Sequence, residues 1–136
     1  MSFGRQKQFE KYVNEKYFEK IVDFVKKNPD KIDCENLISN YQNLTLDMII
    51  KYPELPWNWK LLTYNINISL AWLQAFPDKG WIWKDLSCNY KLTLKWLEAF
   101  PDKPWSYERL SIHKNLHYTW LQTLEEDNQI TSLDLS

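Results

Sequence analysis

A repeated 24-residue pattern constrains the fold of this chain more than any other feature of its sequence. Proline recurs at this spacing, and "PDKGWIWKDLSCNYKLTLKWLEAF" is followed at once by "PDKPWSYERLSIHKNLHYTWLQTL". All eight tryptophans fall in three positions of the repeat. Core residues of a tandem repeat must keep a common register, whereas scattered binding aromatics need not. We therefore predict four copies, at residues 29–52, 53–76, 77–100 and 101–124.

Apolar residues recur at further positions of the repeat. The aligned sets are Ile38, Leu62, Leu86 and Leu110; Leu44, Ile68, Leu92 and Leu116; Met48, Trp72, Trp96 and Trp120; and Ile49, Leu73, Leu97 and Leu121. Two leading positions hold Trp57, Trp81 and Trp105, and Trp59, Trp83 and Tyr107, with Asp33 and Glu35 in the divergent first copy. A half-copy before it places Val22, Phe24 and Val25 in later apolar positions. Atypical terminal units are expected, because they cap the array.

The second half of each copy has the pattern of a short helix. In "SLAWLQAF" the apolar residues are spaced by three and four, as on one helix face. Thr45, Ser69 and Thr93 stand before these segments, where a hydroxyl can accept a bond from a first-turn amide. The proline that follows each segment has no N–H with which to continue the helix.

The first half of each copy predicts a second short helix. In copy two this helix is expected to carry Trp57, Leu61 and Leu62, with Pro56 in its first turn. A turn containing Asn65, or Asn89 in copy three, then leads to the next hydroxyl cap. Helices this short are marginal alone, so stacking must stabilise them.

The predicted fold is an all-α solenoid of stacked two-helix repeats with an N-terminal capping helix. Residues 1–124 form a single α-helical repeat domain, in which residues 1–28 are the cap helix and half-repeat, and residues 125–136 form an acidic C-terminal tail. The alternative is a leucine-rich repeat, because "LTL" and "INISL" alternate like short strands. The asparagine expected after such leucines is absent, which favours helices.

The segments "PDKPWSYERLS" and "PDKGWIWKDLS", each followed by an apolar helix and proline, resemble a tandem repeat of giant DNA viruses of amoebae, of the mimivirus and marseillevirus type. The resemblance runs from Pro29 to about Leu124. The asparagine usual before proline is kept only as Asn28. The resemblance implies a viral origin and a virion or infected-cell setting, and it brings no enzyme activity and no catalytic residues.

The two histidines form the candidate metal-ligand pair that the sequence suggests. His113 and His117 stand four residues apart, as two ligands on one helix face would. Their positions in other copies are turn and cap positions, and no nearby cysteine or third histidine completes a set. We predict no metal-ligating residues and no cofactor.

Candidate catalytic groups are equally sparse. Cys34 and Cys88 occupy different positions of the repeat, without a Cys-x-x-Cys partner or a recognisable base, and are expected to be free thiols. Asp78 and Asp102 recur in the turn after proline and are expected to serve that turn. No catalytic residue is predicted, although a site assembled in space would not be visible in the sequence.

Charge is distributed unevenly along the chain, although the net charge is only −1. Residues 1–28 hold seven Lys and Arg against four acids, whereas residues 125–136 hold four acids and no Lys or Arg. A basic head and an acidic tail are consistent with head-to-tail self-association, with binding of oppositely charged partners, or with two solvated caps. In the head, basic and aromatic residues alternate, a pattern typical of nucleic-acid binding: Lys7, Phe9, Lys11, Tyr12, Lys16 and Tyr17. Glu10, Glu15 and Glu19 interrupt it, as on an exposed helix face.

These observations predict a non-enzymatic protein-interaction or structural module, a virion-associated component if the viral resemblance holds. Its expected partner is another protein or a second copy, and the alternative is a nucleic-acid-associated protein using the basic N-terminal helix. The start of the chain is too charged for a secretory signal, and no apolar run approaches the roughly 20 residues of a membrane helix. We expect an intracellular, reducing setting, no membrane contact and no small-molecule substrate.

Overall fold

The computed structural model describes residues 3–30 and 33–116. All regular secondary structure in these ranges is helical, and they contain no β-strand. The all-α prediction is therefore confirmed, and the strand-bearing leucine-rich alternative is wrong for this part of the chain. The chain divides into two compact units, Met1–Ile68 and Ser69–Ser136, which we call unit 1 and unit 2.

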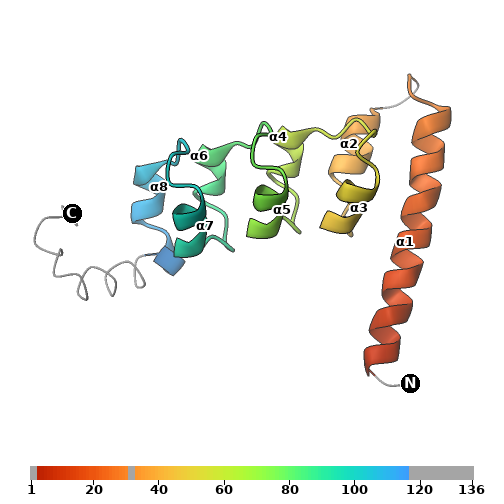
Figure 1. Ribbon diagram of the computed structural model, residues 1–136, viewed down its shortest axis with the longest axis horizontal. Helices are drawn as coiled ribbons and strands as arrows, with labels where there is room; N and C mark the ends of the chain where they lie inside the picture. The colour runs from red at the N-terminus through yellow and green to blue at the C-terminus, as the bar shows by residue number, and fades with distance from the viewer. Residues whose placement is uncertain (1–2, 31–32, 117–136) are drawn as a thin grey trace, which may run out of the picture. The chain divides into compact units, whose positions relative to one another are not determined.

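The described residues of unit 1 form one long helix and three short ones. Its helices are α1 (Phe3–Lys27), α2 (Cys34–Ser39), α3 (Leu46–Lys51) and α4 (Trp59–Leu62). Helix α1 lies beside the α2–α3 pair, and α2 packs against α4 (Figure 1). The ring of Phe18 on α1 lies 5.2, 5.8 and 6.3 Å from the rings of Tyr41, Tyr52 and Trp57. This aromatic cluster fixes the second half of α1 to the first copy and to the start of the second.

In the described part of unit 2, residues 69–116, all helices are short. They are α5 (Leu70–Ala75), α6 (Trp83–Leu86), α7 (Leu94–Ala99) and α8 (Tyr107–Ser111), and residues 114–116 are also helical (Figure 1). The ring of Trp83 lies 5.1 Å from the rings of both Phe100 and Trp105. Aromatic pairs at this separation add to the stabilisation that burial supplies.

The predicted pair of short helices in each copy is confirmed wherever the copies are described. The second helices begin at equivalent residues, Leu46, Leu70 and Leu94. Each ends one residue before a C-cap residue that proline follows, namely Tyr52, Phe76 and Phe100. The expected role of proline in ending these helices agrees with this geometry.

Only one of the three predicted hydroxyl caps is made. Thr45 Oγ1 accepts a bond of 3.3 Å from the backbone N–H of Met48. Ser69 and Thr93 occupy the same N-cap position without a side-chain bond, so the prediction is wrong for them. The reason is that the equivalent amides, of Trp72 and Trp96, donate to the backbone carbonyls of Ser69 and Thr93 at 3.1 and 3.0 Å.

The predicted start of the first helix in copy two is also wrong. Helix α4 begins at Trp59, and the side chain of Asn58 caps it by accepting from Leu61 N–H at 3.0 Å. Pro56 and Trp57 therefore lie before the helix. Trp57 N–H donates to Leu55 O at 2.8 Å, which closes a three-residue turn centred on Pro56.

The core matches the repeat positions closely. Four sets of aligned residues are almost fully buried: Ile38, Leu62, Leu86 and Leu110; Leu44, Ile68, Leu92 and Leu116; Met48, Trp72 and Trp96; and Ile49 and Leu73. Leu97 is half-buried, and Trp120 and Leu121 lie outside the described residues.

The N-terminal half-copy is a different case. Val22 and Val25 are buried as expected, but Phe24 is 47% exposed and its assignment to the core is wrong. Because α1 is one continuous helix of 25 residues, its buried face follows helical periodicity and not the register of the repeat.

Candidate interaction surface

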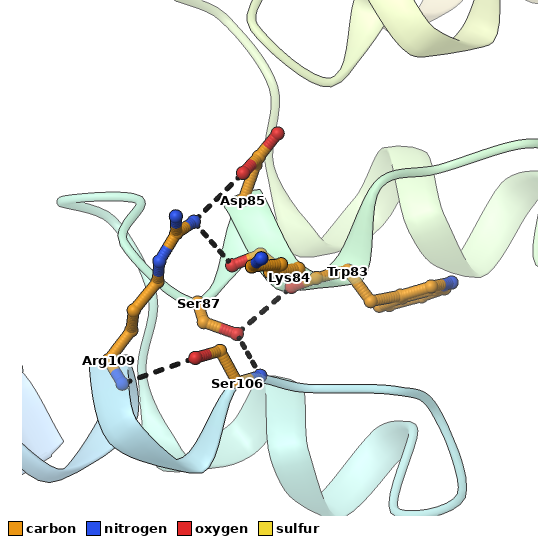
Figure 2. Close-up of polar contacts among 6 residues, drawn as sticks. All are labelled: Trp83, Lys84, Asp85, Ser87, Ser106 and Arg109. Atoms are coloured by element: carbon orange, nitrogen blue, oxygen red, sulfur yellow. Dashed lines mark hydrogen bonds and ion pairs between the residues drawn. The ribbon is translucent and has the colours of Figure 1, made fainter.

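A buried serine joins neighbouring copies within each unit. In unit 2, Ser87 Oγ accepts a bond of 2.9 Å from the backbone N–H of Ser106 and donates to Trp83 O at 3.0 Å (Figure 2). In unit 1, Ser39 Oγ accepts from Asn58 N–H at 2.9 Å in the equivalent place. Ser106 and Asn58 are the N-cap residues of α8 and α4, so each serine fixes where the next helix starts. We call this contact the serine joint.

Sequence reasoning missed the serine joint, although its signal was present. A hydroxyl residue stands ten residues after each repeat proline: Ser39, Thr63, Ser87 and Ser111. The first three are buried. Buried hydroxyls must find hydrogen-bond partners, so a recurring buried hydroxyl indicates a conserved contact within the array.

The first tryptophan of each repeat ties the end of one helix to the start of the next segment. Its indole Nε1–H donates to a C-cap carbonyl at 2.8 Å in all three cases: Trp57 to Tyr52, Trp81 to Phe76, and Trp105 to Phe100. The last carbonyls of a helix lack partners within it. The tryptophan therefore caps the preceding helix, with its side chain buried at Trp81 and Trp105 and half-buried at Trp57, and we call this contact the tryptophan cap.

Asparagine side chains supply a second set of bonds between copies. Asn67 Nδ2 donates to Gln42 O at 2.6 Å and to Leu44 O at 3.0 Å. In unit 2, Asn115 Nδ2 donates to Tyr90 O at 2.8 Å and to Leu92 O at 3.0 Å. The carbonyls in the turn of one copy are thus satisfied by the next copy along the chain.

His113 has a structural role in the same turn. Its Nε2 lies 2.6 Å from Asn89 O, and its Nδ1 accepts from Asn115 N–H at 3.2 Å. The second bond is equivalent to one in the turn of copy two, where Asn65 Oδ1 accepts from Asn67 N–H at 2.9 Å. Both ring nitrogens of His113 are therefore engaged with the backbone.

The candidate metal pair is only half described, because His117 lies outside the described residues. Among the residues that the structure describes, no group of three or more His, Cys, Asp and Glu side chains is placed to hold a metal ion.

The two cysteines lie in separate units, and both are free thiols, as predicted. Cys34 is buried, with its Sγ 3.6 Å from Asn28 O. Cys88 is exposed and lines a shallow groove of about 360 Å³ together with Arg109.

Arg109 is held by the preceding copy. Its Nη1 donates to Asp85 Oδ1 at 2.8 Å and to Lys84 O at 3.1 Å (Figure 2). The hydrogen bond with Asp85 raises the pKa of Arg109, and the nearby Cys88 adds to this effect. Asp78 and Asp102 are exposed in the turns after proline, which agrees with a turn role.

Helix α1 presents an exposed surface of aromatic and charged residues. Phe9, Tyr12, Val13 and Tyr17 are 60%, 57%, 47% and 59% exposed. Lys16 Nζ lies 5.5 Å from the centre of the Tyr12 ring and forms an ion pair of 3.5 Å with Glu19. This is the exposed, mixed-charge helix face that the sequence indicated.

A small polar network holds the middle of α1 to the turn between α2 and α3. Asn14 Nδ2 donates to Asn43 O at 2.8 Å, and the Tyr41 hydroxyl donates to Asn14 Oδ1. The rings of Tyr17 and Tyr41 stack with their centres 6.2 Å apart. Burial raises the pKa of Tyr41, and the neighbouring Tyr17 adds to the shift.

No helix among the described residues is long and apolar enough to span a bilayer. Comparison with known proteins found no matching family model, no similar curated protein and no similar solved structure.

Proposed function

We propose that this chain is a non-enzymatic interaction module whose four copies stack as an all-α solenoid. One observation carries the proposal: the serine joint and the tryptophan cap recur at equivalent residues in both units. A repeat array is held by contacts between neighbouring copies, and each copy presents equivalent surface positions to a partner. The viral resemblance extends the proposal to a virion-associated component.

The surface that would contact a partner lies in the turns between the two helices of a copy. Tyr64 and Ile66 are 60% and 59% exposed in copy two, and Tyr90 and Ile112 are 67% and 80% exposed in copies three and four. Within unit 2, the exposed Tyr90 and Ile112 in successive turns are typical of a protein-binding surface, where aromatic residues supply much of the affinity.

A second candidate function is nucleic-acid binding through α1. The exposed face of α1 combines Lys16 with Tyr12 and Tyr17, and aromatic and basic side chains of this kind stack on bases and neutralise phosphates. The acidic residues of α1 weaken this candidate. It predicts retention of DNA or RNA that falls steeply with salt.

The two functions are separated by recovering tagged full-length protein from its native lysate, with and without nuclease. The interaction module predicts nuclease-resistant protein partners that are lost from the Tyr90→Ser/Ile112→Ser variant. The matched control is Lys95→Ser/Glu98→Ser, which changes two exposed residues of α7. Partners that disappear with nuclease, or that survive in the turn variant as well as in the control, would contradict this proposal.

A further inference from the structure

Helix α1 has two apolar faces, and unit 1 covers only one of them. Phe18, Val22 and Val25 are buried, whereas Phe9, Val13 and Tyr17 are roughly half exposed or more. The second set is spaced by four residues, so its members lie above one another along the helix. We call Phe9, Val13 and Tyr17 the α1 stripe. A capping helix is expected to turn a polar face to solvent, and this stripe departs from that rule.

The α1 stripe forms one wall of a groove. Tyr41 and Asn43, in the turn between α2 and α3, form the other wall, and the groove has a volume of about 340 Å³. Its lining is mostly apolar, and the Asn14 network holds its two walls together. The groove is therefore a built feature of unit 1 with room for apolar side chains from a partner.

Basic residues border the stripe. Four charged residues stand three or four residues from a member of the stripe: Arg5, Lys16 and Lys20 are basic, and Glu10, which also lines the groove, is acidic. Residues 3–20 hold five Lys and Arg against three Glu. Two copies of α1 would therefore bring net like charges together, whereas an acidic partner with apolar side chains fits both the charge and the groove.

The chain itself contains an acidic segment with apolar side chains. Residues 125–136 hold four acidic residues and no Lys or Arg, and they include Ile130, Leu133 and Leu135. We propose that the α1 stripe and its groove bind the acidic C-terminal segment of a second copy of this chain.

This inference rests on the proposed interaction function and names a partner for it. We assign the contact to two molecules, and its dependence on protein concentration distinguishes it from a contact within one chain. A head-to-tail contact of this kind joins two different surfaces, so it builds closed rings or open chains of molecules.

The test measures association of the full-length protein by sedimentation velocity across a concentration series at low salt. Lys16→Glu/Lys20→Glu is expected to weaken association at least tenfold, and so is Glu125→Lys/Glu126→Lys. Combining all four substitutions in one chain is expected to restore association, because the charges are exchanged and not removed. Lys60→Glu/Lys95→Glu carries the same charge change on exposed residues of α4 and α7 and is expected to associate normally. Circular dichroism confirms that each variant is folded.

Four results would overturn the inference. The wild-type protein remains monomeric at every concentration. Association is lost in Val13→Ser but is unchanged by reversal of the tail charges, which indicates pairing of two α1 helices. Nuclease treatment abolishes association, which indicates a nucleic-acid bridge. Each of the two double substitutions weakens association, but combining them in one chain does not restore it. The Tyr90→Ser/Ile112→Ser variant separates this contact from the proposed turn surface, since it is expected to self-associate normally.

Discussion

Helix α1 and the short repeat helices are stabilised in different ways. Helix α1 has 25 residues, and its buried residues, Phe18, Val22 and Val25, all lie in its second half. A repeat helix such as α2 has six residues and buries three of them. Isolated helices of six residues are unstable because nucleation costs more than one turn returns. The short helices therefore depend on their neighbours, whereas the length of α1 leaves one of its faces available to a partner.

The largest expected effect is removal of a repeat tryptophan. Trp96 is 4% exposed in α7, and Trp96→Ala is expected to lower the free energy of unfolding by about 3–5 kcal/mol. Urea denaturation of the full chain measures this change, and Lys95→Ala in the same helix serves as the exposed control. Unchanged stability with lost partner binding would mean that this position faces a partner and not the core.

Loss of a serine joint is the next largest effect. Ser87→Ala removes the acceptor for Ser106 N–H inside the core and is expected to cost about 2 kcal/mol, because an amide is left unsatisfied. Ser111 occupies the same position of the last copy but is exposed, so Ser111→Ala is expected to change stability much less. Equal effects in the two variants, measured by urea denaturation, would show that the joint does not stabilise the stack.

The two faces of α1 can be compared with one matched substitution. Val22 is 3% exposed and Val13 is 47% exposed on the same helix. Val22→Ala removes about two buried carbon groups and is expected to cost about 1.5 kcal/mol, whereas Val13→Ala is expected to stay within about 0.5 kcal/mol. Thermal or urea unfolding of both variants measures the two losses of stability. A comparable loss at Val13 would mean that the α1 stripe is part of the core of the molecule.

A smaller effect, a gain in stability, is expected in the turn that precedes the first helix of a copy, where the copies differ. Pro56 and Pro104 occupy the position that Gly80 holds in copy three. Trp81 N–H donates to Lys79 O at 2.8 Å, as Trp57 and Trp105 do in the equivalent turns, and a Cβ on Gly80 would meet nothing within 4 Å. Gly80→Pro is expected to stabilise the chain by about 0.4–1 kcal/mol, because it restricts the unfolded state. A lower midpoint of thermal unfolding would contradict the equivalence of the three turns.

The smallest expected effect on stability concerns the ion pair between Lys26 of α1 and Glu54 of the second copy. A hydrogen bond from its own backbone amide lowers the pKa of Glu54, and the bond with Lys26, at 3.1 Å, lowers it further. A lowered folded-state pKa stabilises the fold above the ordinary carboxyl pKa, and this stabilisation is lost as pH falls through the lowered value. Glu54→Gln is expected to remove this contribution to the loss of stability at low pH. NMR titration of the Glu54 carboxyl measures its pKa directly. A pKa at or above the ordinary carboxyl value would contradict the structure.

Much of the helical layout was predictable, because each position of the repeat occurs in four aligned copies. The burial of Leu62, Leu86 and Leu110 follows from register alone. The place of Trp57 was not predictable, since helical spacing cannot distinguish a residue in the first turn from one that caps the preceding helix. The exposure of Phe24 was missed because the repeat register was extended into α1, a helix with its own buried face.

The candidate surfaces were less predictable than the core. The role of Ser87 depends on which backbone amide lies opposite it, and Ser106 is 19 residues away in the sequence. The α1 groove needs Tyr41 beside Tyr17, a contact between two segments that share no repeat position. The basic character of α1 was evident from the sequence, but the position of its uncovered face required the structure.

Amide hydrogen exchange of the full-length protein tests the central comparison most directly. At low concentration, residues 3–13 of α1 are expected to exchange rapidly through local opening, while amides of the short helices, such as those of Leu62 and Leu86, exchange only with global unfolding. Raising the protein concentration is expected to protect residues 3–17 as the second copy binds, without changing the short helices. Equal protection of residues 3–13 and the repeat core in dilute monomer would contradict the account, because the first half of α1 would then be as stable as the repeat core without a partner.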